Sequence, residues 1–378
     1  MKRMIYADYA ATTPLSKKAK AAMAEYLAAD FYNPSAKYMA AQKVRRALEQ
    51  ARGIIAECIG ADPREIYFTS GGTEADNWAL KGMAFRYPMQ SKKIITTAIE
   101  HHAVLNSCAF LERIGYTIKY LQVNQQGLVD LTQLEQEMTS ETILVSVMAA
   151  NNEIGTIQPI ARCAEIAHAY GAGFHTDAVQ AIGHIPVEVG ALGVDMLSAS
   201  AHKFGGPKGV GFLYVRKNVP LEQLLSGGGQ EHGSRAGTEN VAGIIGMATA
   251  LQESCDRICA ETQHLLGLRK LLCASLRDNG VDFRVNGTEN VLPGTISLSL
   301  KNMDGEVLLH RLDLMGIQVA TGSACDSKET RLSHVLTALH LPEGYARGTI
   351  RLSLGAQNTE EDVLYIAAAI QKIYYAKG

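Results

Sequence analysis

The sequence predicts an α/β protein in two parts: a large, doubly wound, mostly parallel seven-stranded sheet domain and a smaller α+β domain. Between residues 14 and about 255, short runs typical of buried strands alternate with helical stretches. Several of the intervals are long enough for a crossover helix, which a pair of parallel strands requires. The expected strands are residues 65–69, 93–97, 117–121, 143–148, 172–175, 195–199 and 211–215.

After about residue 255, the alternation of short strands and helices gives way to a different order of elements, which predicts the smaller domain. A long helix over about 256–278 precedes strands near 282–284 and 295–300, a helix at about 305–315 and another at 332–339. A strand at 349–354 comes next, and Asn358-Thr359-Glu360-Glu361 begins a last helix with a cap and an acidic residue at its third position. We expect the large domain over residues 15–255, and the small domain over residues 1–14 and 256–378.

The composition is that of an ordinary globular protein. Of the 378 residues, 47% are hydrophobic and 20% are charged, and the net charge of −2 gives no reason to expect nucleic acid or a membrane as partner. No apolar run reaches the length that spans a bilayer, and the first residues lack the apolar segment of a signal peptide. The seven cysteines form no disulfide framework, which fits reduced thiols in the cytoplasm.

The most informative stretch runs from Ser198 to Gly209. An apolar run leads into Ser200, His202 and Lys203, then comes a glycine-rich turn, and a second apolar run follows. A lysine between two buried strands is poorly solvated, and burial disfavours its ammonium form, so its amine can attack a carbonyl. The aldehyde of pyridoxal phosphate (PLP) is the obvious partner. The alternative is a surface lysine in a hairpin turn.

Three further segments follow expected strands. The Gly72-Thr73 turn opens a helix whose free N–H groups can bind an anion, although many such turns bind nothing. The imidazole of His101 could stack on a planar ring and move protons near neutral pH, or could simply cap a helix. The amide of Asn152 suits a carboxylate or a ring hydroxyl, or belongs to an ordinary turn.

Asp177 closes an expected buried strand, where a carboxylate needs a partner to remain ionised. A protonated pyridine nitrogen would provide that partner, and a helix N-cap is the ordinary alternative. These candidates lie at the carboxyl ends of strands, where open α/β sheets bind ligands. Arg235 and Thr238 lie in a glycine-rich segment that could contact an anion or be a flexible surface loop. Arg351, inside an apolar strand, could bind a substrate carboxylate or form a structural ion pair.

Cys325 lies in a small, polar segment without periodic apolar residues. Most free cysteines are buried and inert, whereas this segment has the exposure and flexibility that a reactive thiol needs. Cys255 and Cys259 are one helical turn apart and could bind a metal, but no cluster of histidines or cysteines lies nearby, so no metal site is expected.

Together these segments resemble the cysteine desulfurases, the NifS/IscS type of class V PLP-dependent enzymes. The resemblance runs nearly from end to end, and the order and spacing of the motifs also match. It is carried by residues 6–14, 33–35, 69–77, 151–155, 198–203, 227–238 and 322–325. The resemblance implies the type I fold of PLP-dependent transferases, pyridoxal 5'-phosphate as cofactor, and a homodimer.

The resemblance also implies a role for each candidate residue. Lys203 would bind PLP covalently and move a substrate proton, and His101 would stack on the ring. Asp177 and Gln180 would pair with the ring nitrogen and the ring hydroxyl, and Cys325 would accept sulfur. The phosphate would be bound by Thr73, Ser200, His202 and Thr238 of the other subunit, the cofactor would also touch Gly72 and Asn152, and the substrate carboxylate would be held by Asn152 and Arg351.

The implied reaction converts L-cysteine to L-alanine and leaves the sulfur as a persulfide on Cys325, for iron–sulfur cluster assembly or tRNA thiolation through an acceptor protein. His101 is the best candidate to assist deprotonation of that thiol. The alternatives are a selenocysteine lyase, another class V enzyme such as an aminotransferase, and an inactive sulfur-relay or scaffold protein. Two departures from the family pattern, Tyr38 and His232, lie outside the proposed chemistry.

Overall fold

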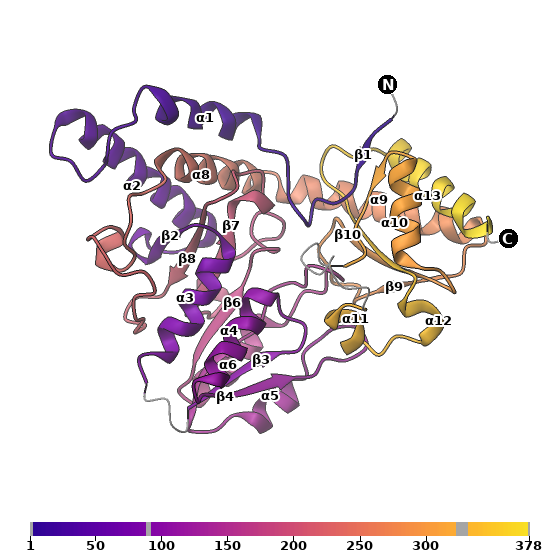
Figure 1. The fold of residues 1–378 in the computed structure, drawn as a ribbon, viewed down its shortest axis with the longest axis horizontal. Coiled ribbons are helices and arrows are strands. Elements are labelled where there is room, and N and C mark those ends of the chain that lie inside the picture. Colours follow the sequence, from indigo (N-terminus) through magenta and orange to yellow (C-terminus); the bar gives the residue numbers. More distant parts are fainter. Residues whose placement is uncertain (1–2, 88–91, 323–331, 377–378) are drawn as a thin grey trace.

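The computed structural model describes residues 3–87, 92–322 and 332–376. A seven-stranded sheet with helices on both faces lies beside a smaller group of strands and helices (Figure 1). None of the described helices is both long enough and apolar enough to cross a membrane.

The large sheet has the strand order β2-β8-β7-β6-β5-β3-β4. Strand β8 pairs antiparallel with both of its neighbours, and the other pairs are parallel. The predicted seven-stranded, mostly parallel sheet is therefore confirmed. Its strands are β2 (Ile66–Thr69), β3 (Lys93–Thr97), β4 (Thr117–Leu121), β5 (Thr142–Ser146), β6 (Gly173–Asp177), β7 (Met196–Ser200) and β8 (Gly211–Val215).

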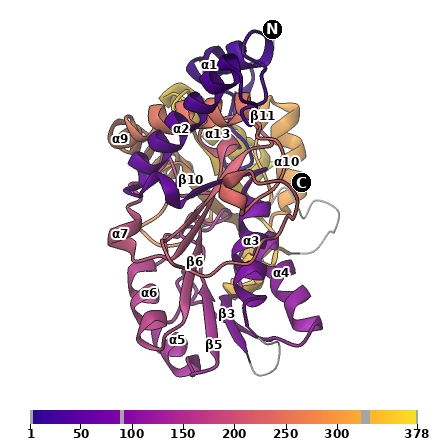
Figure 2. The ribbon, with the colours of Figure 1, turned by 90° about the vertical axis from the view of Figure 1, so that its left-hand side faces the viewer.

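Helices cover both faces of this sheet because its central strands bury side chains on both sides. In β5, Val145 packs into one apolar cluster and Leu144 into another on the opposite face. Figure 2 shows α6 and α7 on one side of the strands and α3 and α4 on the other. The helices of this part are α1 (Lys17–Ala28), α2 (Met39–Ile59), α3 (Gly72–Ala84), α4 (His102–Arg113), α5 (Leu131–Glu137), α6 (Ile160–Ala169), α7 (Val189–Leu192) and α8 (Val241–Cys255).

The smaller group has its own apolar core, which includes Leu272, Leu298, Ile350 and Ile366. An antiparallel sheet of order β12-β10-β9 supports it, and β1 pairs with β11. We propose that this core marks the small domain, with the bounds expected from the sequence. Its elements are β1 (Ile5–Tyr6), α9 (Ile258–Asp278), β9 (Phe283–Asn286), β10 (Thr295–Leu300), α10 (Gly305–Leu314), β11 (Ile317–Gln318), α11 (His334–Ala338), α12 (Glu343–Ala346), β12 (Thr349–Ser353) and α13 (Glu360–Tyr375).

The beginning of α13 differs from the predicted one by a residue. Thr359 is the N-cap, and Asp362 is the acidic residue at the third position, each accepting from the backbone N–H of the other. Asn358 is not the cap because its amide is already engaged: Oδ1 accepts from the Gly355 N–H, and Nδ2 donates to the carbonyl of Tyr6.

A buried ion pair attaches the glycine-rich segment to the rest of the large part. Arg52 of α2 and Glu231, in the 3-10 turn Glu231–Gly233, have side chains only 4% and 3% exposed. Their two hydrogen bonds measure 2.9 and 2.8 Å. Glu231 also accepts from the Phe68 N–H at 2.8 Å, and the Arg52 guanidinium lies over the Phe68 ring. The pair thus joins α2, the edge strand β2 and the segment that carries Thr238.

We expect Arg52→Ala to lower the free energy of unfolding by about 3–5 kcal/mol, because it leaves the Glu231 carboxylate buried without its cation. Urea unfolding followed by far-UV circular dichroism measures this loss. Arg64→Ala is the matched control, since it breaks an exposed pair with Asp62 and should leave the urea midpoint unchanged. Equal midpoints for the two variants would contradict the structural role of the Arg52 pair.

Candidate active site

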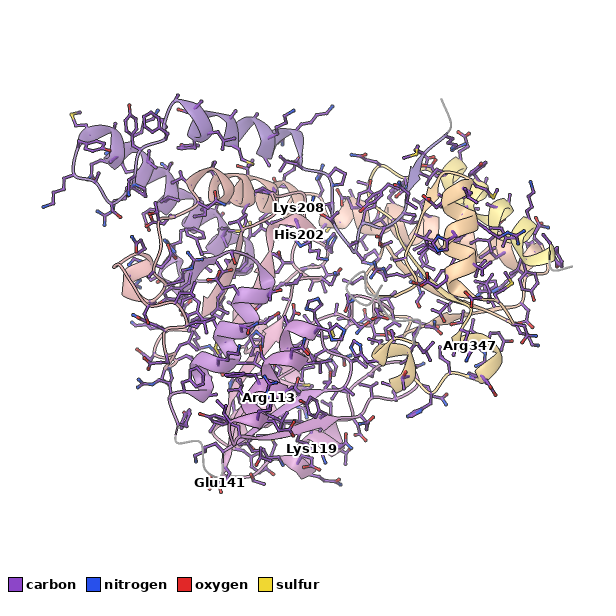
Figure 3. The ribbon with its side chains drawn as sticks, viewed as in Figure 1. Arg113, Lys119, Glu141, His202, Lys208 and Arg347 are labelled. Atoms are coloured by element: carbon purple, nitrogen blue, oxygen red, sulfur yellow. The ribbon has the colours of Figure 1, made fainter. Side chains whose placement is uncertain are left out.

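A cavity of about 250 Å³ lies where the carboxyl ends of the large-sheet strands meet β12 and the N-terminal arm. Figure 3 shows His202 at this end of the sheet, while Lys119 and Glu141 lie at the opposite end. The cavity is lined by Ala10, Ala11, Gly72, Thr73, Asp76, His101, Met148, Asn152, Asp177, Val179, Gln180, Ser200, His202, Lys203 and Arg351. Ten residues named from the sequence therefore meet in one place.

Lys203 reaches the cavity from the 3-10 turn Ala201–Lys203, which connects β7 to the turn before β8. Its Nζ donates to the carbonyl oxygens of Ala10 at 2.6 Å and Ala11 at 3.0 Å. The amine is thus held by the backbone of the N-terminal arm. The lysine lines a cavity instead of standing in an exposed hairpin.

One end of the cavity offers N–H and hydroxyl groups to an anion. Helix α3 begins after Gly71, which provides no side-chain cap, so its first backbone N–H groups remain available for a ligand. Thr73, Ser200 and His202 lie beside them. Burial is the main reason that the pKa of His202 falls to about 4, so its ring is neutral at physiological pH.

The carboxyl group of Asp177 also lines the cavity, and Asp177 is the last residue of β6. Asp177 is 5% exposed, and its Oδ1 accepts from the Val179 N–H at 2.9 Å. Burial raises its pKa, while His101 and Lys203 act in the opposite direction. No α-helix follows directly, so the helix N-cap alternative does not apply. A cationic N–H group in the cavity would stabilise the ionised form of this carboxyl group.

His101 both caps α4 and lines the cavity. Its Nδ1 accepts from the Ala103 N–H at 3.1 Å. Burial lowers the pKa of His101, which favours the neutral ring. With Nδ1 engaged as an acceptor, the ring proton belongs on Nε2. His101, which lines the cavity, is therefore a hydrogen-bond donor through Nε2, and this tautomer has no free ring lone pair with which to act as a base.

Arg351 of β12 is only 3% exposed and forms the wall opposite the sheet. Its Nη2 donates to Asp8 Oδ1 at 2.6 Å, and its Nη1 donates to the Asn152 carbonyl at 3.0 Å. Its Nε is buried and has no hydrogen-bond partner within the described ranges. The structural ion pair considered from the sequence exists, and the N–H groups of the guanidinium that these two bonds do not use remain for a ligand.

Asn152 and Gln180 also line the cavity. Asn151 builds the turn that presents Asn152, because its Oδ1 accepts from the N–H groups of Glu153 and Ile154. The Nε2 of Gln180 donates to the Ala10 carbonyl at 3.0 Å.

Three candidate residues named from the sequence, Arg235, Thr238 and Cys325, are not among those that line this cavity. Thr238 lines a separate cavity with Arg235, which pairs with Glu74 at 2.8 Å. Cys325 lies outside the described residues. Asp8 and Asp76 were not expected at the site from the sequence. Asp76 could have been found from its spacing, because it follows Gly72 by four residues, which places both on one face of α3.

Comparison with known proteins identifies the family. The Aminotransferase class-V model matches residues 5–366. The chain belongs to this family. It is 49% identical to "Cysteine desulfurase IscS" of Dictyoglomus turgidum over 374 residues, covering 99% of this chain and 95% of that protein. It therefore belongs to the cysteine desulfurases of the family.

Solved structures agree with this assignment. A structure titled "NIFS-LIKE PROTEIN" superposes with a TM-score of 0.92 at 39% identity, covering 98% of this chain and 99% of the other. A structure titled "SspA in complex with cysteine" superposes with a TM-score of 0.82 at 36% identity, covering 94% and 100%. The predicted fold type and family are thus confirmed.

Enzymes of this family depend on PLP, and the cavity fits that cofactor. Asp177 offers a buried carboxyl group to a ring nitrogen, and the beginning of α3 offers N–H groups to a phosphate. Lys203 lines the same cavity and offers the amine that would bind the aldehyde. Gly72 leaves necessary room, because a Cβ there would come within 2.6 Å of Val179 Cγ2.

We expect Gly72→Ala to weaken PLP binding roughly tenfold or more, since overpacking of this size costs about 1–3 kcal/mol. Titration of the apoenzyme with PLP, followed by its visible absorption, measures the dissociation constant. Gly53→Ala is the control: it is also a helical glycine, but a Cβ there meets no atom within 4 Å. Unchanged PLP affinity in Gly72→Ala would show that the cofactor lies elsewhere.

Proposed function

We propose that the chain is a cysteine desulfurase that converts L-cysteine to L-alanine and transfers the sulfur to Cys325 as a persulfide. The observation that carries this proposal is a single cavity lined by Lys203, Asp177, the beginning of α3 and Arg351. The relatives named cysteine desulfurase support the choice of L-cysteine. They do not favour a selenocysteine lyase, an aminotransferase or an inactive scaffold.

The substrate carboxylate binds Arg351 and Asn152 in this proposal. Asp8 and the Asn152 carbonyl fix the plane of the guanidinium, so its remaining N–H donors have set directions. A fixed donor lowers the entropic cost of orienting the substrate amino acid.

Lys203 removes the proton from the substrate Cα. The Ala10 and Ala11 carbonyls hold the amine at the cavity wall, where it can reach a substrate bound to Arg351. Bound PLP supplies an electron sink that stabilises the negative charge left at Cα. Asp177 supports this role by pairing with the ring nitrogen, while Thr73, Ser200 and His202 bind the phosphate.

In the next step, Cys325 accepts the sulfur of the substrate. The Cys325 thiolate attacks the substrate sulfur, the S–S bond forms, and the Cβ–S bond breaks. The electron pair of that bond stays with the substrate carbon, which gains a proton to become the methyl group of alanine. In this proposal the Lys203 ammonium, which holds the proton taken from Cα, supplies the proton of the methyl group. The neutral His101 ring can donate a hydrogen bond from Nε2 during these steps, and we assign it that role in place of the base expected from the sequence.

The persulfide then passes to an acceptor protein for iron–sulfur cluster assembly or tRNA thiolation. We also propose a homodimer in which Thr238 of one subunit binds the phosphate in the other. The support is that Thr238 lies in a cavity separate from that of Lys203 within one chain.

We expect Cys325→Ala to bind L-cysteine and change the visible absorption of the enzyme, yet form alanine at least about 10³-fold more slowly, because the sulfur has no nucleophile to accept it. Lys203→Ala should lose the visible band as well as the activity. Alanine assays and absorption spectra of both variants separate the two roles. Near-normal alanine formation by Cys325→Ala would exclude a persulfide on this residue.

Mixed dimers test the shared site. Lys203→Ala and Thr238→Ala should each bind PLP more weakly than the wild type. In a mixed dimer, one site contains both substitutions and the other contains neither. We expect mixing and re-equilibration of the two variants to restore about half of the wild-type activity per heterodimer. Sedimentation should show a dimer, and an active monomer would contradict the arrangement.

A further inference from the structure

Asp76 is a buried carboxyl group in the cavity wall that the proposed mechanism does not use. It is 1% exposed, and neither of its carboxylate oxygens has a hydrogen-bond partner within the described ranges. The Ser198 hydroxyl is near enough to favour the ionised form somewhat, but it is already bonded to His175 Nε2 at 3.0 Å. The Oδ1 of Asp76 lies 3.7 Å from that same His175 nitrogen.

Asp76 lies close to the carboxyl group of Asp177. One carboxylate oxygen of each, together with a ring nitrogen of His101, all lie within 4.8 Å of one another. Two fully buried negative charges at such a separation repel strongly, because little solvent screens them. Burial, followed by the charge of Asp177, raises the pKa of Asp76 well above its usual value.

The charged groups around Asp76 do not relieve this repulsion. His175, on the same strand as Asp177, is neutral because burial lowers its pKa to about 3. From the connection between β3 and α4, Glu100 adds a third buried carboxyl group whose pKa burial raises to about 8. Neutral His101 comes from the same connection. Lys203, after β7, directs its amine to two carbonyl groups of the N-terminal arm.

We propose that Asp76 is a further positioning residue of the cofactor site: it carries a proton, and the Asp76–Asp177 pair presents one negative charge to the ring nitrogen of bound PLP. A neutral carboxyl group is a hydrogen-bond donor, whereas a second carboxylate would compete with Asp177 for the cofactor. The inference rests on the PLP-dependent function proposed above. It does not depend on which amino acid is the substrate.

The pH dependence of apoenzyme stability tests where the proton lies. Below about pH 3.9, the carboxyl group of residue 76 is protonated in both the folded and the unfolded chain. Above that pH, the carboxyl group of residue 76 ionises in the unfolded chain but stays protonated in the folded chain. The folding constant of the wild type therefore falls about tenfold per pH unit relative to that of Asp76→Asn. This fall ends where the pH reaches the pKa of Asp76 in the folded chain. We expect this widening ratio between pH 5.5 and 7.5 in chemical unfolding of the full-length apoenzyme.

Asp362→Asn is the control. Asp362 is also an aspartate with little exposed surface, but it accepts from the Thr359 N–H and pairs with Arg3. Because these contacts lower the pKa of Asp362, it is ionised in both the folded and the unfolded chain between pH 5.5 and 7.5, and the ratio of folding constants between its variant and the wild type should stay constant there. A constant ratio between wild type and Asp76→Asn across this pH range would overturn the proposal, because Asp76 would then be ionised in the folded protein.

The loaded enzyme provides a second, spectroscopic readout. We expect Asp76→Ala to shift the pH midpoint of the visible PLP band, since Asp177 loses its neutral donor, and Asp76→Asn to restore the wild-type midpoint to within about 0.3 pH units. Equal shifts in both variants would mean that charge at residue 76 matters, and would overturn the proposal. A wild-type enzyme that released no alanine from L-cysteine would contradict the proposed function and leave both readouts valid.

Discussion

The N-terminal arm holds the two halves of the site in register. The Ala10 carbonyl accepts from both Lys203 and Gln180, which belong to the large part, while the Ala10 N–H donates to Ser353 of β12. Asp8, two residues earlier, pairs with Arg351 of the same strand. Because these contacts share one short piece of backbone, the Lys203 amine and the Arg351 guanidinium, to which we assign proton movement and substrate binding, are oriented together. A displaced arm would misplace both at once.

The large sheet could be predicted almost strand by strand. Its central strands are buried on both faces, so they appear in the sequence as short apolar runs, and all seven expected runs overlap the observed strands with ends within two residues. The cluster of Gly72, His101, Asp177 and Lys203 followed from the same pattern, because the carboxyl ends of strands meet at one edge. Motif order and spacing then supplied the family, and with it the separate roles of these residues.

Pairings between distant residues could not be predicted from one sequence. Asp8 and Arg351 are separated by 343 positions, and nothing local in either segment indicates the other. The same holds for Arg52 and Glu231, and for the approach of Asp76 to Asp177. The tautomer of His101 depends on one backbone N–H two residues away, which requires the helix to begin at that position. These contacts decide protonation and orientation, so the sequence indicated which residues take part but not the charge each one carries.

The turn at residues 151–153 connects the cavity to three other parts of the chain. Asn152 lines the cavity, and its carbonyl accepts from Arg351 Nη1 of β12. The next residue, Glu153, accepts from the Ser333 hydroxyl at 2.7 Å, and a Cβ on Gly322 would lie 3.3 Å from the same carboxylate oxygen. Because Ser333 is the N-cap of α11, one short turn holds the start of that helix, Gly322 and the Arg351 guanidinium beside the cavity. A change in this turn would therefore displace the guanidinium and the start of α11 together.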